Sequence, residues 1–246
     1  MFSVLTIIDI GSFGLVLFSA FRRIASKPRT VEALFIDCDD CIYQNNWKTA
    51  EKITQSISAY TAQMGVSREK AYELYKTHGT CLKGLLVEGL VDEEGAETFL
   101  RTVHTIDYTD IEADPRLQSE LAGLRVPHWI FTASAAEHAQ RCMERVGIAT
   151  LPWRGIIDTR SCKFESKYAQ SSFQAAMEAA NVSDASACVF CDDSIKNIKA
   201  AKAAGWRTVL VGMIDRDSGS KIDTPSEADA HIASLHELRS VMPELF

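Results

Sequence analysis

Asp37 and Asp39 are separated by one residue and follow the apolar run Ala33–Ile36. At the end of a strand, one carboxylate of such a pair can attack an electrophile while the other exchanges a proton with the leaving group. That chemistry suits phosphoryl transfer. The charge of two carboxylates also calls for a divalent cation, and Mg²⁺ favours carboxylate, phosphate and water oxygens. The pair therefore predicts Mg²⁺-assisted phosphoryl transfer; the plainer alternative is an acidic loop after a strand.

A second apolar run, residues 128–131, leads into Thr132, Ala133 and Ser134, and then into a helical stretch at 135–146. The first N–H groups of a helix have no partners within the helix, and the helix dipole favours anions. A hydroxyl and free amides at this turn therefore predict a phosphate cradle. The alternative is that Ser134 serves as an ordinary N-cap.

A third run, residues 187–191, ends in Asp192 and Asp193 before a helical stretch at 195–204. These acids would complete a metal site at the same edge of a parallel sheet. Asn197 shares a helix face with Asp193, four residues earlier. An Asp at a helix N-terminus is also favourable without any metal, by about 0.3–1 kcal/mol.

Two lysines between the second and third runs, Lys163 and Lys167, could bring a cation to a phosphate and a nucleophilic carboxylate. Most lysines are solvated surface residues, so the residue type alone does not choose between them.

The ordered set resembles the haloacid dehalogenase superfamily of phosphohydrolases. That family places Asp-x-Asp after the first strand, Thr or Ser after the second, Lys before a later helix and an acidic pair after the fourth strand. The matching positions here are Asp37, Asp39, Thr132, Lys167, Asp192 and Asp193. Lys167 is preferred over Lys163 because the family lysine usually precedes a helix aromatic by six positions, here Phe173. The resemblance runs from about residue 31 to residue 212.

The resemblance implies a mechanism through an aspartyl-phosphate, with Asp37 as nucleophile and Asp39 as proton donor and acceptor. The implied phosphate-binding residues are Thr132, Ala133 and Lys167. The implied Mg²⁺ ligands are Asp37, Asp39 through its carbonyl, Asp192 and Asp193.

Segments 74–85, 113–115, 130–132 and 138–141 look like the pyrimidine 5'-nucleotidase branch, whose members dephosphorylate UMP and CMP. Candidate substrate selectors are His78, Thr80, Lys83 and Asn197, although residues 78–84 also suit a plain loop between helices. The chain departs from the family pattern at Cys41, where Thr is common, and at Ala133, where Asn is common. These changes put neighbouring hydrogen bonds and rate in question rather than the chemistry.

Other functions fit the same residues. The substrate could be another small phosphomonoester, such as pyridoxal phosphate or a sugar phosphate, and a phosphomutase would share the first steps. A dehalogenase has no need of an acid at Asp39, which disfavours that activity. From a different class, the chain could be a catalytically silent binding or scaffold protein.

Alternation of strand-like and helical segments predicts an α/β fold, a Rossmann-like doubly wound parallel sheet. The expected strands are residues 33–37, 128–131, 187–191, 208–211 and 230–232. Helical patterns at 47–64, 67–77 and 92–104 are too long for a simple crossover. We therefore expect a catalytic core at residues 31–44 and 112–246, with an inserted helical cap at 45–111 over the site. Asp114 with Pro115 should open a helix, and Ser234 should open the last one.

The chain of 246 residues has 26 Lys plus Arg against 33 Asp plus Glu, a net charge of −7. An acidic chain with no basic stripe is a poor binder of nucleic-acid polymers, whereas a small phosphorylated metabolite remains a suitable partner.

Seven cysteines, an odd number, argue against full disulfide pairing and favour a reducing compartment. Zinc binding by the pairs Cys38/Cys41 and Cys188/Cys191 is disfavoured; Cys188 and Cys191 lie within an apolar strand, where residues three apart face opposite ways. Oxidation of Cys38 or Cys191, which adjoin catalytic acids, is a hypothesis for control of activity.

Residues 1–30 form an apolar amino-terminal segment, in which 1–21 carry one charge, Asp9, and basic residues follow. We expect an anchor or a targeting segment, with a helix packed on the core as the alternative. Membrane contact is expected only through residues 1–21, and the basic flank would keep the catalytic domain facing the cytoplasm.

Overall fold

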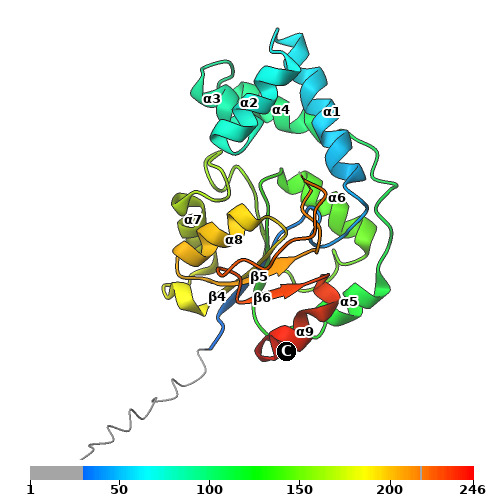
Figure 1. Cartoon of the computed structure of the whole chain (residues 1–246), viewed down its shortest axis with the longest axis vertical. Coiled ribbons are helices and arrows are strands. Elements are labelled where there is room, and N and C mark those ends of the chain that lie inside the picture. Colours follow the sequence, from blue (N-terminus) through cyan, green and yellow to red (C-terminus); the bar gives the residue numbers. More distant parts are fainter. Residues whose placement is uncertain (1–29, 217) are drawn as a thin grey trace, which may run out of the picture.

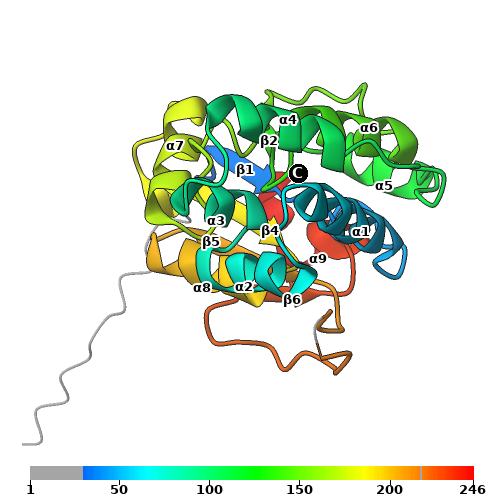
Figure 2. The ribbon, with the colours of Figure 1, turned by 90° about the horizontal axis from the view of Figure 1, so that it is seen from above.

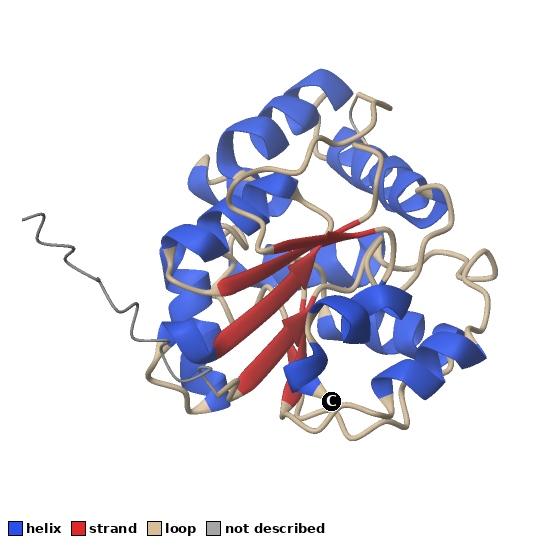
Figure 3. Ribbon diagram, turned by 60° about the horizontal axis from the view of Figure 1, so that its bottom comes forward, coloured by secondary structure: helices blue, strands red, loops and turns tan. Residues whose placement is uncertain are grey.

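The computed structural model describes residues 30–216 and 218–246. Within them, six strands form one sheet in the order β3-β2-β1-β4-β5-β6, and every neighbouring pair is parallel. Figure 3 shows the sheet between layers of helices, as expected for a doubly wound α/β fold. The strands are β1 (Ala33–Ile36), β2 (His128–Phe131), β3 (Ile156–Ile157), β4 (Cys188–Asp192), β5 (Arg207–Val211) and β6 (Ala230–Ile232).

Both faces of the sheet are buried, which explains why the strands read as continuous apolar runs. In β1, Leu34 and Ile36 join the hydrophobic cluster on one face, and Ala33 and Phe35 join the cluster on the other. The first face packs against α5 (Pro115–Leu121), α6 (Ala136–Val146) and α9 (Leu238–Val241). The second packs against α7 (Gln170–Ala180) and α8 (Ile195–Ala203).

The strand order reverses around β1, which lies between β2 and β4. Connections from its two neighbours leave in opposite directions, so a crevice forms outside the carboxyl ends of these strands. The segments that follow β1, β2 and β4 all reach this edge.

Helices α1 (Lys48–Gln63), α2 (Arg68–His78), α3 (Cys81–Val87) and α4 (Glu93–Val103) form a separate layer beyond this edge (Figure 1). They enclose their own hydrophobic cluster, which includes Leu74, Leu85 and Phe99. Figure 2, which looks down on this layer, shows it spread across the end of the sheet. The division into a catalytic core at residues 31–44 and 112–246 and an inserted cap at 45–111 stays a prediction. The separate helical layer is compatible with it.

Contacts tie the helical layer to the segment between β3 and α7. Arg160 pairs with Glu97 of α4 at 2.8 Å, and Lys83 of α3 pairs with Glu165 at 2.6 Å. Gly79 ends α2 with a φ of +89°, and a Cβ there would lie 2.4 Å from the Tyr168 hydroxyl and 2.6 Å from Ser166 Cβ. The layer therefore packs directly on the residues that flank Lys167.

Most expected elements lie where the sequence placed them, with three corrections. Strand β3 was missed because it has only two residues. The loop alternative for residues 78–84 was wrong over most of its length, because Thr80 caps α3 through its hydroxyl, which accepts from the Lys83 amide at 3.0 Å. Ser234 makes no cap hydrogen bond and precedes a 3₁₀ turn at Leu235–Glu237 rather than an α-helix.

None of the helices in the described part of the chain has the length and apolarity that crossing a bilayer requires. The predicted anchor or targeting segment at residues 1–21 lies outside the described residues.

Candidate active site

The carboxyl edge of the sheet borders a cavity of about 1130 Å³ that extends to helices α1, α2 and α4. The side chains that follow β1, β2 and β4 converge on it because parallel strands end at the same edge. The sequence-predicted residues that line it are Asp37, Asp39, Thr80, Thr132, Ala133, Ser134, Lys167, Asp193 and Asn197. Asp192, the last residue of β4, is buried behind this surface.

Lys167 joins two of the predicted acids. Its Nζ lies 2.5 Å from Asp37 Oδ1 and 2.7 Å from Asp192 Oδ2, and its side chain is 3% exposed. Burial disfavours the ammonium, but the two carboxylates outweigh that penalty and raise the pKa of Lys167. Lys163 is exposed on the preceding turn. The geometry therefore supports the choice of Lys167 over Lys163.

Asp192 uses both oxygens to hold its neighbours. Oδ1 accepts hydrogen bonds from the Ser194 amide at 2.8 Å and from Asn197 Nδ2 at 3.0 Å, and Oδ2 accepts from Lys167. Asn197 thus contacts Asp192 through its amide. Of the acidic pair, Asp193 is the member that faces the cavity.

The ligand oxygens of Asp37, Asp192 and Asp193 all lie within 4.8 Å of one another. Against three carboxylates stands one ammonium, that of Lys167, so the ionised group would carry a net charge of −2 (−3 + 1). Burial, followed by the charge of Asp192, raises the pKa of Asp193, and burial likewise raises the pKa of Asp37. An all-oxygen donor set with excess negative charge fits a hard divalent cation such as Mg²⁺.

Asp39 has a different set of partners. Its Oδ1 accepts from the Tyr43 hydroxyl at 2.5 Å and lies 2.8 Å from His138 Nε2, and its Oδ2 accepts from the Ser134 hydroxyl at 3.1 Å. Burial alone would raise the pKa of Asp39, but the charge and hydrogen bond of His138 hold it below its usual range. The N-cap alternative for Ser134 was wrong, since Ala135 occupies the N-cap position and Ser134 turns to Asp39.

His138 is a site residue whose contact with Asp39 was not predicted. Burial would lower its pKa, but the charge and hydrogen bond of Asp39 raise it well above the ordinary value. Its other nitrogen, Nδ1, lies 2.9 Å from the Tyr108 hydroxyl. A signal was present in the sequence, because His138 falls in the first turn of a helix whose N-terminus was expected to face the site.

Thr132 presents its hydroxyl at the end of β2. Its Oγ1 accepts from the Ser134 amide at 3.0 Å, which leaves the hydroxyl proton to donate elsewhere. Thr132 is buried and the neighbouring Ala133 is exposed, and both line the cavity.

A family model of haloacid dehalogenase-like hydrolases matches residues 31–205, most of the chain. The chain belongs to the haloacid dehalogenase-like hydrolase family. The resemblance drawn from the ordered motifs is thereby confirmed at the level of the superfamily.

This haloacid dehalogenase-like hydrolase is similar to individual proteins whose names point to different chemistries. It is 26% identical over 201 residues to phosphate metabolism protein 8 of Saccharomyces cerevisiae, covering 73% of this chain and 61% of that relative's length. CbbY of Rhodobacter sphaeroides, solved with xylulose-(1,5)-bisphosphate, superposes with a TM-score of 0.62 at 17% identity, covering 85% and 96% of the two chains. The L-2-haloacid dehalogenase of Xanthobacter autotrophicus gives 0.55 at 13% identity, covering 87% and 99%. At these identities the solved structures establish the fold and not the reaction.

Of the four residues predicted to select the substrate of this hydrolase, two line the cavity and two do not. Thr80 and Asn197 line the cavity, whereas His78 and Lys83 do not, and Lys83 is engaged by Glu165. Their role in substrate choice stays a prediction. Tyr72 and Tyr75 of α2, which the sequence reasoning missed, are exposed rings on the cavity wall.

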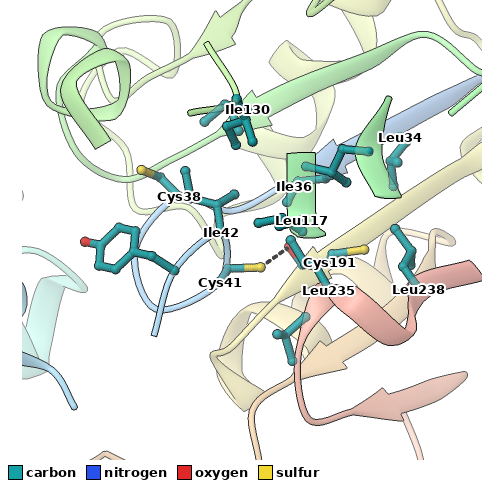
Figure 4. Close-up of a cluster of buried hydrophobic side chains, with 14 of the residues drawn as sticks. Leu34, Ile36, Cys38, Cys41, Ile42, Leu117, Ile130, Cys191, Leu235 and Leu238 are labelled. Carbon is teal, nitrogen blue, oxygen red and sulfur yellow. Dashed lines mark hydrogen bonds between the residues drawn. The ribbon is translucent and has the colours of Figure 1, made fainter. Parts of the chain in front are cut away.

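All seven cysteines are free and buried. The thiols of Cys38 and Cys41 point to opposite sides of their loop, and Cys41 Sγ donates to the Cys191 carbonyl at 3.7 Å (Figure 4). Cys188 and Cys191 lie on opposite faces of the sheet. The expectation that neither Cys-x-x-Cys pair binds zinc stays a prediction.

The thiols differ in acidity. Burial raises the pKa of Cys191, and a hydrogen bond with Cys142, together with burial, raises that of Cys38. The same hydrogen bond, with help from His138, lowers the pKa of Cys142 to about 7. Control by oxidation of Cys38 or Cys191 stays a prediction, and Cys142 is the more acidic thiol.

Proposed function

We propose that this chain is a Mg²⁺-dependent phosphomonoesterase that works through an aspartyl-phosphate intermediate. The observation that carries the proposal is the ion pair between Lys167 and Asp37, which positions a buried carboxylate at the switch point of the sheet. Asp39, Thr132 and Asp193 border the same cavity.

Asp37 is oriented for attack through one oxygen. Its Oδ1 accepts from the Cys38 amide at 2.7 Å and pairs with Lys167, so Oδ2 is the oxygen that remains for phosphorus. Attack forms the Asp37–phosphorus bond as the bond from phosphorus to the leaving oxygen breaks. Water then cleaves the aspartyl-phosphate and regenerates Asp37.

Asp39 handles the protons of both steps. The leaving oxygen takes a proton from Asp39, and Asp39 then removes a proton from the attacking water. His138 Nε2, 2.8 Å from Asp39 Oδ1, holds the proton that Asp39 passes on. The hydroxyls of Tyr43 and Ser134 fix the carboxylate in place.

Negative charge on the transferring phosphoryl oxygens meets donors on one side of the cavity. These are the Thr132 hydroxyl, the Ala133 amide and Lys167 Nζ. Preorganised donors of this kind are each worth roughly 10²–10³ in rate. Mg²⁺ would be held by Asp37, Asp193 and the Asp39 carbonyl, with Asp192 close by, and would neutralise phosphoryl charge.

For the substrate we propose a nucleoside monophosphate, a pyrimidine nucleotide first. The cavity of about 1130 Å³ has room for more than a small phosphate ester. The rings of Tyr72 and Tyr75, 6.1 Å apart, give α2 an aromatic surface on which a base could stack. Helices α1–α4 would act as the cap that excludes water. The S. cerevisiae relative, named for phosphate metabolism, supports phosphate chemistry in general.

The test is a phosphate-release screen over UMP, CMP, purine monophosphates, pyridoxal phosphate and sugar phosphates, with Mg²⁺ or with EDTA. We expect release with Mg²⁺, loss of release in EDTA, and the highest kcat/KM for a pyrimidine nucleotide. Release from pyridoxal phosphate or a sugar phosphate alone would refute the nucleotide assignment. Transfer of phosphate to a second sugar hydroxyl would identify a phosphomutase, and no turnover of any ester would favour the binding or scaffold alternative.

A further inference from the structure

A second group of potential metal ligands lies beside the proposed catalytic centre. It consists of Cys38, Asp39, His138 and Cys142, whose ligand atoms all lie within 4.8 Å of one another. Three of the four, all but Asp39, are buried. It differs from the Asp37 group in chemistry, because it offers two sulfurs and a nitrogen instead of carboxylates alone.

The spacing of these atoms suits a tetrahedral ion. Cys142 Sγ lies 3.5 Å from His138 Nε2. Zinc–sulfur and zinc–nitrogen bonds of about 2.3 and 2.0–2.1 Å at a tetrahedral angle would place such atoms about 3.6 Å apart. Residues 138 and 142 share one face of α6, and Cys38 approaches from the loop after β1. Asp39 Oδ1 lies 2.8 Å from His138 Nε2, closer than two ligands of one tetrahedral ion would be, so Asp39 has to move outward to serve as the fourth ligand.

The ring of His138 is held in the orientation that metal binding needs. The Tyr108 hydroxyl donates to the His104 carbonyl at 2.9 Å, so its oxygen accepts the proton of His138 Nδ1. That contact keeps one proton on Nδ1 and directs Nε2 at the sulfurs. Metal-bound histidines in proteins nearly always donate their other nitrogen in this way.

We propose that Cys38, His138 and Cys142, with Asp39 as the fourth ligand, form a site for a thiophilic divalent cation, Zn²⁺ by preference. Thiolate and imidazole donors select such ions over Mg²⁺, which takes oxygen. Binding forms two metal–sulfur bonds, one metal–nitrogen bond and one metal–oxygen bond. Two thiol protons and the Nε2 proton leave to solvent, so the charge of the group changes from 0 to −1 (0 + 2 − 3).

The ion has a route to this site. The side chain of Asp39 is 26% exposed and lines the cavity, while the other three ligands lie behind it. An ion that enters from the cavity meets Asp39 first and then the sulfurs. Occupancy would pull Asp39 and His138 away from proton transfer and inhibit turnover. The inhibition rests on the proposed phosphatase, whereas the binding does not.

Binding is tested with Co²⁺, which reports thiolate ligands by a near-ultraviolet charge-transfer band and tetrahedral geometry by visible bands. Reduced protein in excess Mg²⁺ is titrated as the unmodified chain, as Cys142→Ala and as Cys188→Ala. Cys188 is the matched control, because it is also a buried cysteine but lies at the amino end of β4, away from the carboxyl edge of the sheet where the proposed site is. We expect one thiolate site in the unmodified chain and in Cys188→Ala, and at least about tenfold weaker binding in Cys142→Ala.

The absence of a thiolate band in the unmodified chain, or an equal band in Cys142→Ala, would overturn the proposal. Circular dichroism and thermal melting check folding, and Cys38→Ala replaces Cys142→Ala if the latter fails to fold. Phosphate release in Zn²⁺ then tests the inhibition, which Cys142→Ala should relieve and Cys188→Ala should not. Equal inhibition of all three proteins, reversed by added Mg²⁺, would mean that zinc acts at the Asp37 group and would refute inhibition through the cysteines. The cobalt spectrum tests metal binding even if the chain has no phosphatase activity, so failure of the proposed function and failure of the metal site can be told apart.

Discussion

Asp37 and Asp39 are two residues apart, carry the same side chain and sit in opposite surroundings. Asp37 turns toward β4, where it meets Lys167 and two further carboxylates. Asp39 turns toward α6, where it meets His138 and two hydroxyls. The pKa of Asp37 is raised and that of Asp39 is lowered. Placing one motif between the end of β4 and helix α6 thus separates a nucleophile and cation group from a proton-transfer group.

Among the substitutions considered, Asp37→Asn should reduce turnover most severely, because it removes the proposed nucleophile. The amide cannot form the aspartyl-phosphate, so we expect kcat to fall by about 10⁴-fold or more. Phosphate release under Mg²⁺ measures it, with circular dichroism to confirm the fold. Near-normal turnover would refute the assignment of Asp37 as nucleophile.

Asp39→Asn should impair proton transfer and leave the nucleophile Asp37 and its cation group intact. We expect a loss of about 10²–10⁴-fold for esters whose leaving oxygen needs a proton. The loss should be smaller for p-nitrophenyl phosphate, whose leaving group departs without one. Comparing kcat for UMP and for p-nitrophenyl phosphate measures the difference, and equal losses on both substrates would contradict proton donation by Asp39.

Lys167→Gln tests whether the Lys167 ammonium positions and stabilises the carboxylates of Asp37 and Asp192. It should lower kcat by about 10²–10³-fold, because Asp37 loses its positioning partner. It should also lower the free energy of unfolding in EDTA by about 3–5 kcal/mol, since two buried carboxylates lose their counter-charge. Lys163→Gln is the control, as Lys163 is exposed on the same segment. Similar effects from the two substitutions, in urea unfolding and in kcat, would argue against a special role for Lys167.

Gly79→Ala probes how the helical layer supports Lys167. Gly79 and Gly65 both have positive φ, so Ala at either position costs about 1–2 kcal/mol of stability. Only at Gly79 does the new Cβ meet Tyr168 and Ser166, whereas nothing lies within 4 Å of a Cβ at Gly65. We expect Gly79→Ala to reduce kcat severalfold and Gly65→Ala to leave it within about twofold. Equal kcat in the two variants would show that this contact does not position Lys167.

Local sequence signals predicted much of the fold. The apolar runs that became β1, β2, β4, β5 and β6 were found because strands buried on both faces need uninterrupted hydrophobicity. Strand β3 gave no such signal, since Ile156 and Ile157 are too few to show a pattern. Helix α3 was hidden because Thr80 follows Gly79 closely and the whole helix has seven residues.

The amino-acid sequence by itself determined the family, the order of the strands along the chain and the positions at which acids follow them. Strand-end acids need only local hydrophobicity to be recognised. Only the tertiary structure showed which side chains meet, such as His138 with Asp39 and Cys38 with Cys142. It also brought Lys167, which the family spacing had favoured over Lys163, to Asp37. These partners come from elements that are far apart along the chain, and the direction of each side chain depends on how a helix packs against the sheet. No local pattern records that packing.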